Sequence, residues 1–313
     1  MKRRDFLKTS AILFPIGGST VSNYGWLPPI LPSPEPTLFE TYPSLEGSGA
    51  GRVVLLYKYI EKILKKSYPA YRQQGPDCTS MAGGQGIDFV QAIQATLQKK
   101  SWINRAATEY LHIGGRQVIG KRKKGGVGIK EAMTFAATFG IIFRQKYKFE
   151  NQKFNFTNYD YQNAIALGKD VPDWLLNKGQ QHRVGKLVKV STWREVRDAV
   201  RNLYPIVIGS KVGFDGKTNW SGALRDKDGF CEPKGTWYHA WLLIGVDDRH
   251  KRPGGCLMNS HGENWVKGPT RNKQPNGSIW VGKDVIQEMV SKYNDSYAIC
   301  DLKGFQPKKY QLW

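Results

Sequence analysis

One cysteine of this 313-residue sequence stands where a thiol becomes reactive. Cys78 follows Pro76 and Asp77, which are start signals for a helix, and Asp77 suits the N-cap position. Apolar residues then recur at helical spacing, at Ile87, Val90, Ile93 and Leu97. Because the first turn of a helix offers exposed backbone N–H groups and the positive end of the helix dipole, we expect both to favour the thiolate of Cys78.

A histidine and an asparagine lie in the second half of the chain, each beside a predicted strand. Residues 235–247 predict a long apolar strand with His239 near its start. Residues 254–265 predict a short strand that ends at Asn259 and then turns at glycine. Two further short strands are predicted, at 277–281 and 297–301. Short strands with turns between them indicate a mainly antiparallel sheet or barrel.

The order of these motifs resembles the papain superfamily of cysteine peptidases, in a divergent form found in bacteria and phages. The motifs are Gln before Cys78, then His239-Ala, then Asn259-Ser-x-Gly-x-x-Trp. The segment that begins Gly125-Gly126 is also similar to a family segment. The resemblance covers roughly residues 70–302 and is patchy between 150 and 190. It implies an α+β, two-lobed fold, with a helical lobe, an antiparallel β-barrel lobe and an active cleft between them.

The resemblance also assigns roles to single residues. Cys78 would be the nucleophile, and His239 the base that takes its proton. Asn259 would orient the imidazole through a hydrogen bond. Gly125 and Gly126 would line the cleft that binds substrate. The implied reaction is the hydrolysis of peptide bonds in a peptide or protein through a thioester intermediate.

Two parts of the family pattern are altered in this chain. The oxyanion donors would be the backbone N–H of Cys78 and the amide of Gln73 or Gln74, of which Gln73 has the better reach. An overlay without gaps puts Ser80 at the nucleophile position, but we prefer Cys78 with a shortened loop because a thiolate paired to histidine needs no further activation. His261 replaces the usual tryptophan, so that it either shields the Asn–His hydrogen bond less or perturbs the base.

The same cleft suits two alternatives to a peptidase. One is a catalytically inactive module that binds peptide or cell-wall material, and the other is a cell-wall amide hydrolase that uses the same triad. The sequence holds no Cys-x-x-Cys and no His-Glu-x-x-His, so we predict neither a metal site nor a cofactor. Four cysteines are too few for a disulfide scaffold in a chain of this length.

The chain is strongly basic, with a formal net charge of +21. Such a surface keeps a protein soluble and attracts polyanions, which makes an anionic surface or a cell-wall polymer a second class of partner. No helix-turn-helix, zinc-finger or RNA-binding signature is present, so no specific nucleic-acid partner is predicted. No apolar run reaches the roughly 18 residues of a membrane span.

The first residues are similar to a bacterial twin-arginine export signal. Arg3 and Arg4 are followed by Phe-Leu-Lys and a short apolar stretch, and residues 26–36 are rich in proline. We therefore expect a signal and spacer over 1–45, and export to the periplasm or the cell exterior. The peptidase domain is expected over 46–313.

Within that domain, we expect a mainly helical lobe over 46–150 and a mainly β lobe over 186–303. Residues 52–66 read as an amphipathic helix, and the sequence leaves open whether residues 23–70 form a propeptide. Thr192 and Glu195 match a capping box at the start of another helix. Glycines at 83, 84 and 86 inside the predicted helix of Cys78 indicate that another backbone approaches it closely.

Overall fold

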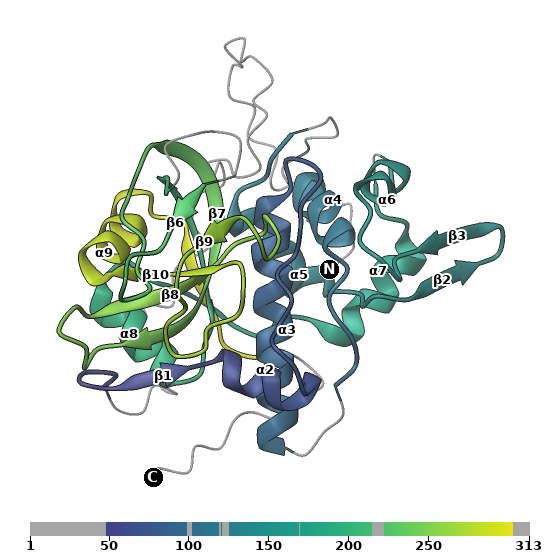
Figure 1. Cartoon of the computed structure of the whole chain (residues 1–313). Coiled ribbons are helices and arrows are strands. Elements are labelled where there is room, and N and C mark those ends of the chain that lie inside the picture. Colours follow the sequence, from purple (N-terminus) through teal and green to yellow (C-terminus); the bar gives the residue numbers. More distant parts are fainter. Residues whose placement is uncertain are drawn as a thin grey trace.

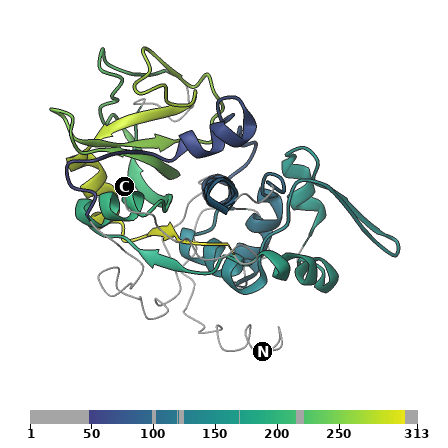
Figure 2. The same cartoon turned by 90° about the horizontal axis from the view of Figure 1, so that it is seen from below.

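The computed structural model describes residues 48–98, 102–118, 120, 125–168, 170–214 and 222–302. The predicted signal and spacer, residues 1–45, lie outside them. Two lobes lie side by side, one of helices with a small hairpin and one of an antiparallel sheet with two helices (Figure 1). Figure 2 looks along the axis of α3 (Cys78–Gln98) and shows this helix between the sheet and the other helices. The predicted two-lobed α+β architecture is confirmed.

The helical lobe surrounds α3, which is buried along nearly its whole length. Its other elements are α4 (Thr108–Val118), α5 (Ile129–Phe139), the hairpin β2 (Lys146–Phe149) and β3 (Gln152–Asn155), α6 (Tyr161–Ala166), α7 (Asp173–Gly179) and the 3-10 turn η2 (Gln180–His182). A Cβ on Gly84 would lie 2.5 Å from the Thr108 side chain, and one on Gly86 would lie 2.6 Å from that of Ile299. The close approach that we predicted at these glycines is therefore made by side chains of neighbouring elements and not by another backbone.

The β lobe is built on one sheet with the strand order β10-β8-β7-β5-β11-β4, and β1 also pairs with β7. All of these pairings are antiparallel. The strands are β1 (Val53–Leu55), β4 (Leu187–Lys189), β5 (Ile206–Val212), β7 (Thr236–Asp247), β8 (Gly254–Met258), β10 (Ser278–Gly282) and β11 (Ser296–Ile299). A second, parallel pair joins β6 (Ala223–Leu224) to β9 (Val266–Lys267). The helices of this lobe are α8 (Trp193–Arg201) and α9 (Lys283–Lys292).

The sheet is open, which corrects the prediction of a closed barrel. β10 and β4 are its edges, and no pairing joins them within the described part of the chain. Leu242 of β7 lies against Gly86 of α3, whereas the next residue, Leu243, lies with Ile286 of α9 against Gly255. Helices thus cover both faces of the sheet. Because helices cover the apolar side chains on both faces, the sheet does not need to close into a barrel to bury them.

The prediction of a single helix over 52–66 is wrong in its first part. Val53–Leu55 forms β1, in which Val53 pairs with Asp247 and Leu55 with Gly245. The helix α2 spans only Tyr57–Leu64. The residue before it, Leu56, still bonds to β7, since its N–H donates to the carbonyl of Ile244 at 2.9 Å. Pairing with β7, far along the chain, outweighs the local helical pattern and joins this segment to the β lobe.

Helix α8 begins with the predicted capping box. The hydroxyl of Thr192 accepts from the N–H of Glu195 at 3.2 Å, and the Glu195 carboxylate accepts from the N–H of Thr192 at 3.0 Å. The prediction is confirmed. It could be made from the sequence because this motif is local and needs no distant partner.

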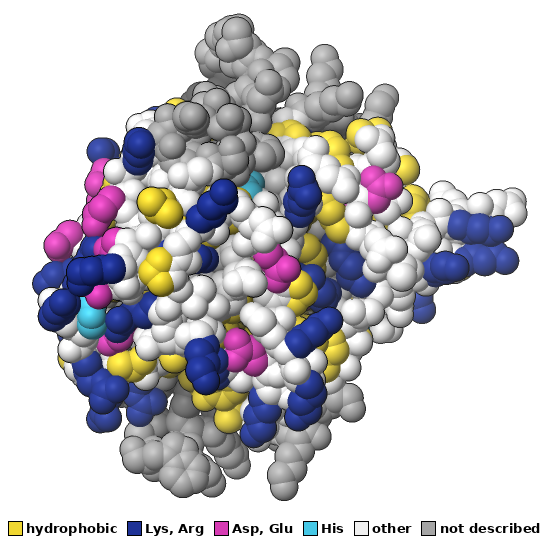
Figure 3. Space-filling model, viewed as in Figure 1, with side chains coloured by type: hydrophobic (Ala, Val, Ile, Leu, Met, Phe, Trp, Pro, Cys, Tyr) yellow, Lys and Arg dark blue, Asp and Glu magenta, His cyan; other side chains and the backbone are white. Residues whose placement is uncertain are grey.

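The surface of the described residues is rich in basic side chains. They are spread over the face seen in Figure 3 and gather on the projecting hairpin of β2 and β3, where Lys146, Lys148 and Lys153 are exposed. None of the described helices has the length and apolar character needed to cross a membrane.

Candidate active site

Cys78 is the first residue of α3 and is buried. Its sulfur accepts a hydrogen bond from the backbone N–H of Ala240, the residue that follows His239 on β7. Burial raises the pKa of the Cys78 thiol to about 12, and the neighbouring Asp77 carboxylate raises it further, against this hydrogen bond. Burial therefore opposes the thiolate that the start of α3 is expected to favour. The thiol is neutral.

His239 and Asn259 are held together from two adjacent strands. His239 lies on β7, and Asn259 follows β8 directly; both side chains are buried. Nε2 of His239 lies 2.7 Å from Oδ1 of Asn259. The same Oδ1 accepts the N–H of Ser260 at 2.6 Å, which identifies this atom as the amide oxygen. Nε2 therefore carries the proton and donates it to Asn259, which leaves Nδ1 as the proton acceptor.

Burial also keeps the imidazole neutral. It lowers the pKa of His239 to about 4, and the hydrogen bond to Asn259 opposes this shift. The resting pair is thus a neutral thiol and a neutral imidazole. Transfer of the thiol proton to His239 creates two charges, and it becomes favourable only when another group stabilises one of them.

Aromatic rings enclose the imidazole. The ring centroids of Trp237 and Trp241 lie 4.9 and 5.0 Å from that of His239. The ring of His261 lies 4.6 Å from His239 and stacks on Trp237 at 5.6 Å. Burial lowers the pKa of His261 well below its usual range, and a charge on His239 lowers it further. His261 is therefore a neutral ring beside that of His239, at the place where the papain pattern usually has a tryptophan.

The two candidate glutamines have different environments. Gln73 is buried; its side chain accepts from the hydroxyl of Ser260 at 2.6 Å and donates to the carbonyl of Gly75 at 2.9 Å. Its backbone N–H donates to the Ser260 carbonyl at 2.8 Å. Gln74 is exposed, and its amide oxygen accepts from the N–H of Tyr161 at 3.2 Å. Gln73 is the one bound next to Asn259.

Ser80, the competing nucleophile, lies inside the first turn of α3. Its buried hydroxyl donates to the backbone carbonyl of Asp77 at 2.8 Å. A hydroxyl bound in this way stabilises the first turn of α3. This geometry favours Cys78 over Ser80.

The glycine segment predicted to bind substrate lies beside the start of α3. The hydroxyl of Thr79 donates to the carbonyl of Val127 at 2.7 Å, and the guanidinium of Arg116 donates to the carbonyls of Gly125 and Gly126. Gly125 has a φ of 138°, a conformation that favours glycine. The segment is therefore fixed next to Cys78 through its own backbone.

Sequence reasoning missed Tyr159, which belongs to the site's surroundings. Its hydroxyl donates to Oδ2 of Asp77 at 2.7 Å and accepts from the N–H of Gln74 at 3.0 Å. No local pattern marks a tyrosine 82 residues away along the chain from its carboxylate partner. Only the fold brings them together.

The other described residues that could act as nucleophiles or metal ligands are the remaining cysteines and the His, Asp and Glu side chains. Cys231, Cys256 and Cys300 are buried, like Cys78, and none of these four cysteines is in a disulfide. The described part of the chain contains no group of three or more His, Cys, Asp or Glu side chains arranged to hold a metal ion.

Several solved structures that are similar to this chain are described as cysteine proteases. The chain is similar to xylellain, a cysteine protease from Xylella fastidiosa, with a TM-score of 0.59 and 16% identity over 91% of this chain and 98% of that one. Digestive procathepsin L 3 of Tenebrio molitor matches with a TM-score of 0.47 and 16% identity over 95% of this chain and 78% of that one. No protein-family model matches the sequence, and no curated protein matches it either. The likeness to xylellain shows that the chain has a papain-like fold.

Proposed function

We propose that the chain is a cysteine peptidase that hydrolyses peptide bonds through Cys78, His239 and Asn259. The observation that carries this proposal is the hydrogen bond of 2.7 Å from His239 to Asn259. The next residue on β7, Ala240, donates its backbone N–H to the sulfur of Cys78. A nucleophile, a base and an orienting amide are the parts that such a reaction needs. The papain-like fold supports the same assignment.

The neutral resting pair determines how the reaction begins. Nδ1 of His239 accepts the thiol proton as the sulfur attacks the carbonyl carbon of the substrate, and the C–N bond then breaks as the imidazolium gives this proton to the leaving amine. Water attacks the resulting thioester, with the imidazole taking its proton, and the acid product leaves as the thiol re-forms. The amide of Gln73 and the N–H of Cys78 stabilise the oxyanion in both steps.

An epoxide thiol inhibitor tests this proposal directly. We expect one adduct by mass spectrometry, on Cys78, and much slower labelling in His239→Ala. The three other cysteines are buried and serve as internal controls, because a reaction governed by exposure alone does not select Cys78 among four buried thiols. The proposal would be sunk if the native protein gave no adduct on Cys78 with a reagent that labels the other thiols once the protein is partly denatured.

Hydrolysis assays separate the peptidase from its two alternatives. Cleavage of unmodified peptides that is lost in Cys78→Ala supports the peptidase. Peptide binding without cleavage identifies an inactive binding module, and cleavage confined to peptidoglycan cross-links identifies a cell-wall amide hydrolase.

We further propose that the chain is exported in folded form through its twin-arginine-like N-terminus. The support is the motif itself, Arg3 and Arg4 before a short apolar stretch. Replacing both arginines by lysine is expected to leave the protein in the cytoplasm of a bacterial host that carries the twin-arginine translocon. Fractionation of cells that express each form measures this, and unchanged export would contradict it.

A further inference from the structure

The hydroxyl of Tyr159 forms two hydrogen bonds to the loop between Gln73 and Cys78. Tyr159 donates to the carboxylate of Asp77 at 2.7 Å and accepts from the N–H of Gln74 at 3.0 Å. One end of this short loop is the oxyanion glutamine and the other is the nucleophile. The hydroxyl therefore spans the loop between the two groups whose separation sets the oxyanion site.

Tyr161 adds a second contact to the same loop. Its N–H donates to the side-chain oxygen of Gln74 at 3.2 Å, and its ring covers Gly75 so closely that a Cβ there would lie 2.6 Å from it. Its own hydroxyl makes no hydrogen bond to the described residues. The ring of Tyr161 thus packs on the loop, whereas the hydroxyl of Tyr159 bonds to it.

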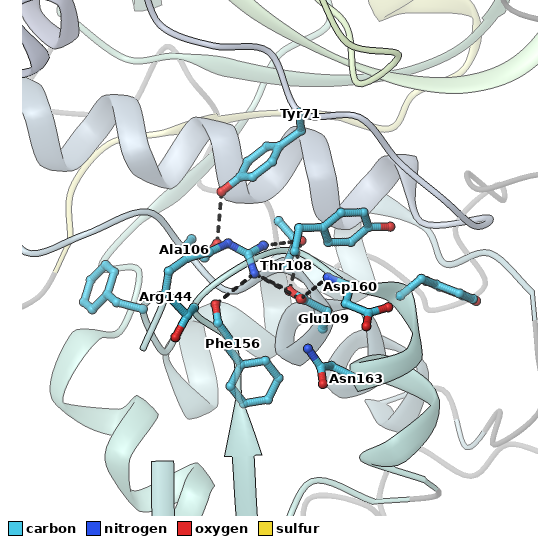
Figure 4. Close-up of polar contacts among 12 residues, drawn as sticks. Tyr71, Ala106, Thr108, Glu109, Arg144, Phe156, Asp160 and Asn163 are labelled. Carbon is cyan, nitrogen blue, oxygen red and sulfur yellow. Dashed lines mark hydrogen bonds and ion pairs between the residues drawn. The ribbon is translucent and has the colours of Figure 1, made fainter. Parts of the chain in front are cut away.

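The segment that carries Tyr159 rests on a buried ion pair. Arg144 and Glu109 lie 2.9 Å apart, with both side chains almost fully buried. The Glu109 carboxylate accepts the N–H of Asp160 at 3.0 Å, and Arg144 donates to the carbonyl of Phe156 at 3.3 Å (Figure 4). The backbone is therefore fixed on both sides of Tyr159. A phenol supported in this way has little freedom to follow the loop if the loop moves.

We propose that Tyr159 is a positioning residue that fixes the Gln73–Cys78 loop for oxyanion binding. This inference rests on the proposed function, since it assigns Tyr159 a part in that reaction. Only four residues separate Gln73 from Cys78, so few contacts within the loop are available to hold the Gln73 amide at a fixed distance from the N–H of Cys78. A misplacement of about 1 Å at such a donor is enough to cost on the order of a hundredfold in rate.

The matched pair Tyr159→Phe and Tyr161→Phe tests the proposal. Each variant loses one hydroxyl and keeps its ring, but only the first loses the bonds to Asp77 and Gln74. We expect Tyr159→Phe to lower kcat by about ten- to a hundredfold with KM within about twofold, and Tyr161→Phe to stay near the wild type.

Two inhibitors distinguish positioning from general damage. A peptide aldehyde adds to the Cys78 sulfur and places an oxyanion in the site, so its binding should weaken in Tyr159→Phe as much as kcat falls. Iodoacetamide alkylates the thiol by displacement and forms no such oxyanion, so its rate should stay within about twofold. Equal loss of both reactions in Tyr159→Phe would overturn the positioning role.

Hydrogen exchange tests the restraint without relying on turnover. Backbone amides of residues 73–77 should exchange faster in Tyr159→Phe than in the wild type and in Tyr161→Phe. Unchanged exchange in Tyr159→Phe would overturn the inference, and so would faster exchange with unchanged kcat. A wild-type protein that hydrolyses no peptide overturns the proposed function alone, because the exchange comparison still decides whether Tyr159 restrains the loop.

Discussion

At the residue scale, the hydrogen bond between His239 and Asn259 determines which imidazole nitrogen is available to the thiol. The Asn259 oxygen accepts from Nε2 of His239 and from the N–H of Ser260. If this oxygen is removed, the ring is free to rotate between the flanking tryptophans, and either tautomer forms. In the proposed reaction, proton transfer at His239 therefore depends on an amide that itself takes no proton.

The first prediction concerns this amide. Asn259→Ala is expected to lower kcat/KM by about ten- to a hundredfold, because the fraction of His239 in the productive orientation and tautomer falls. Steady-state hydrolysis measures the loss, and Asn264→Ala, an exposed asparagine in the following turn, is the control. An Asn259→Ala variant as active as the control would show that Asn259 does not orient the base.

The second prediction concerns Asp77 and the pH dependence of stability. Burial raises the pKa of Asp77 to about 7 from its ordinary 3.8, against the hydrogen bond from Tyr159. Between these values the native state keeps a proton that the unfolded state loses, so the wild type loses stability as pH rises from about 4 to about 7. Asp77→Asn has no such proton and should become the more stable protein, by about 1.4 kcal/mol for each pH unit in that window.

Urea unfolding at pH 4, 5.5 and 7.5 measures the difference between Asp77→Asn and the wild type. The exposed Glu263 provides the control, since Glu263→Gln should change stability little at any of the three. A difference for Asp77→Asn that is the same at every pH would contradict the prediction.

Local patterns explain why the contexts of some candidate site residues could be predicted from the sequence and those of others could not. His239 and Asn259 lie at the ends of strongly apolar strands, so their contexts were visible within about ten residues. Gln73 and Gln74 are neighbours with the same chemistry, and only their distant partners, Ser260 and Tyr161, distinguish them. The neutral state of Cys78 also depends on burial by the whole fold.

At the element scale, the helical lobe depends on the buried pair of Arg144 and Glu109. Arg144 also donates to Thr108 at 3.0 Å and to the carbonyl of Phe156 (Figure 4). These bonds join α4 to the chain on both sides of the hairpin formed by β2 and β3. The hairpin and the Tyr159 segment thus share one buried anchor.

The third prediction is that Arg144→Met destabilises the protein by about 3–5 kcal/mol, because it leaves the carboxylate of Glu109 buried without its partner. Equilibrium urea unfolding measures this loss. Arg194→Met removes an exposed arginine 3.9 Å from Asp198 and should cost less than about 1 kcal/mol. Equal effects of the two changes would show that the buried pair is not the anchor of this lobe.

The elements themselves differ in how far the sequence determines them. α3, β7, β8 and the capped helix α8 each have a continuous local pattern and were predicted. β1 was not, because its three residues become a strand only through pairing with β7. The open sheet was likewise hidden, since closure depends on α3 and α9 covering both faces and not on any strand pattern.

At the scale of the whole molecule, the net charge of +21 has a local focus on the projecting hairpin. Lys148 and Lys153 are direct cross-strand partners, and Lys146, two residues before Lys148 on β2, is exposed on the same face. No ion pair to an acidic side chain is found for these three lysines within the described residues. Like charges placed directly opposite each other repel, and a polyanion that binds across both strands would relieve this repulsion.

The fourth prediction follows from this arrangement. The wild-type protein should be retained on an immobilised polyphosphate column and elute as salt rises, because screening weakens contacts between exposed charges. Replacing Lys146, Lys148 and Lys153 by glutamine should lower the salt concentration at elution. A control with Lys62, Lys65 and Lys66 replaced by glutamine loses the same charge from an exposed stretch at the end of α2. A larger shift for the hairpin variant assigns polyanion binding to the hairpin, whereas equal shifts would mean that net charge alone determines retention.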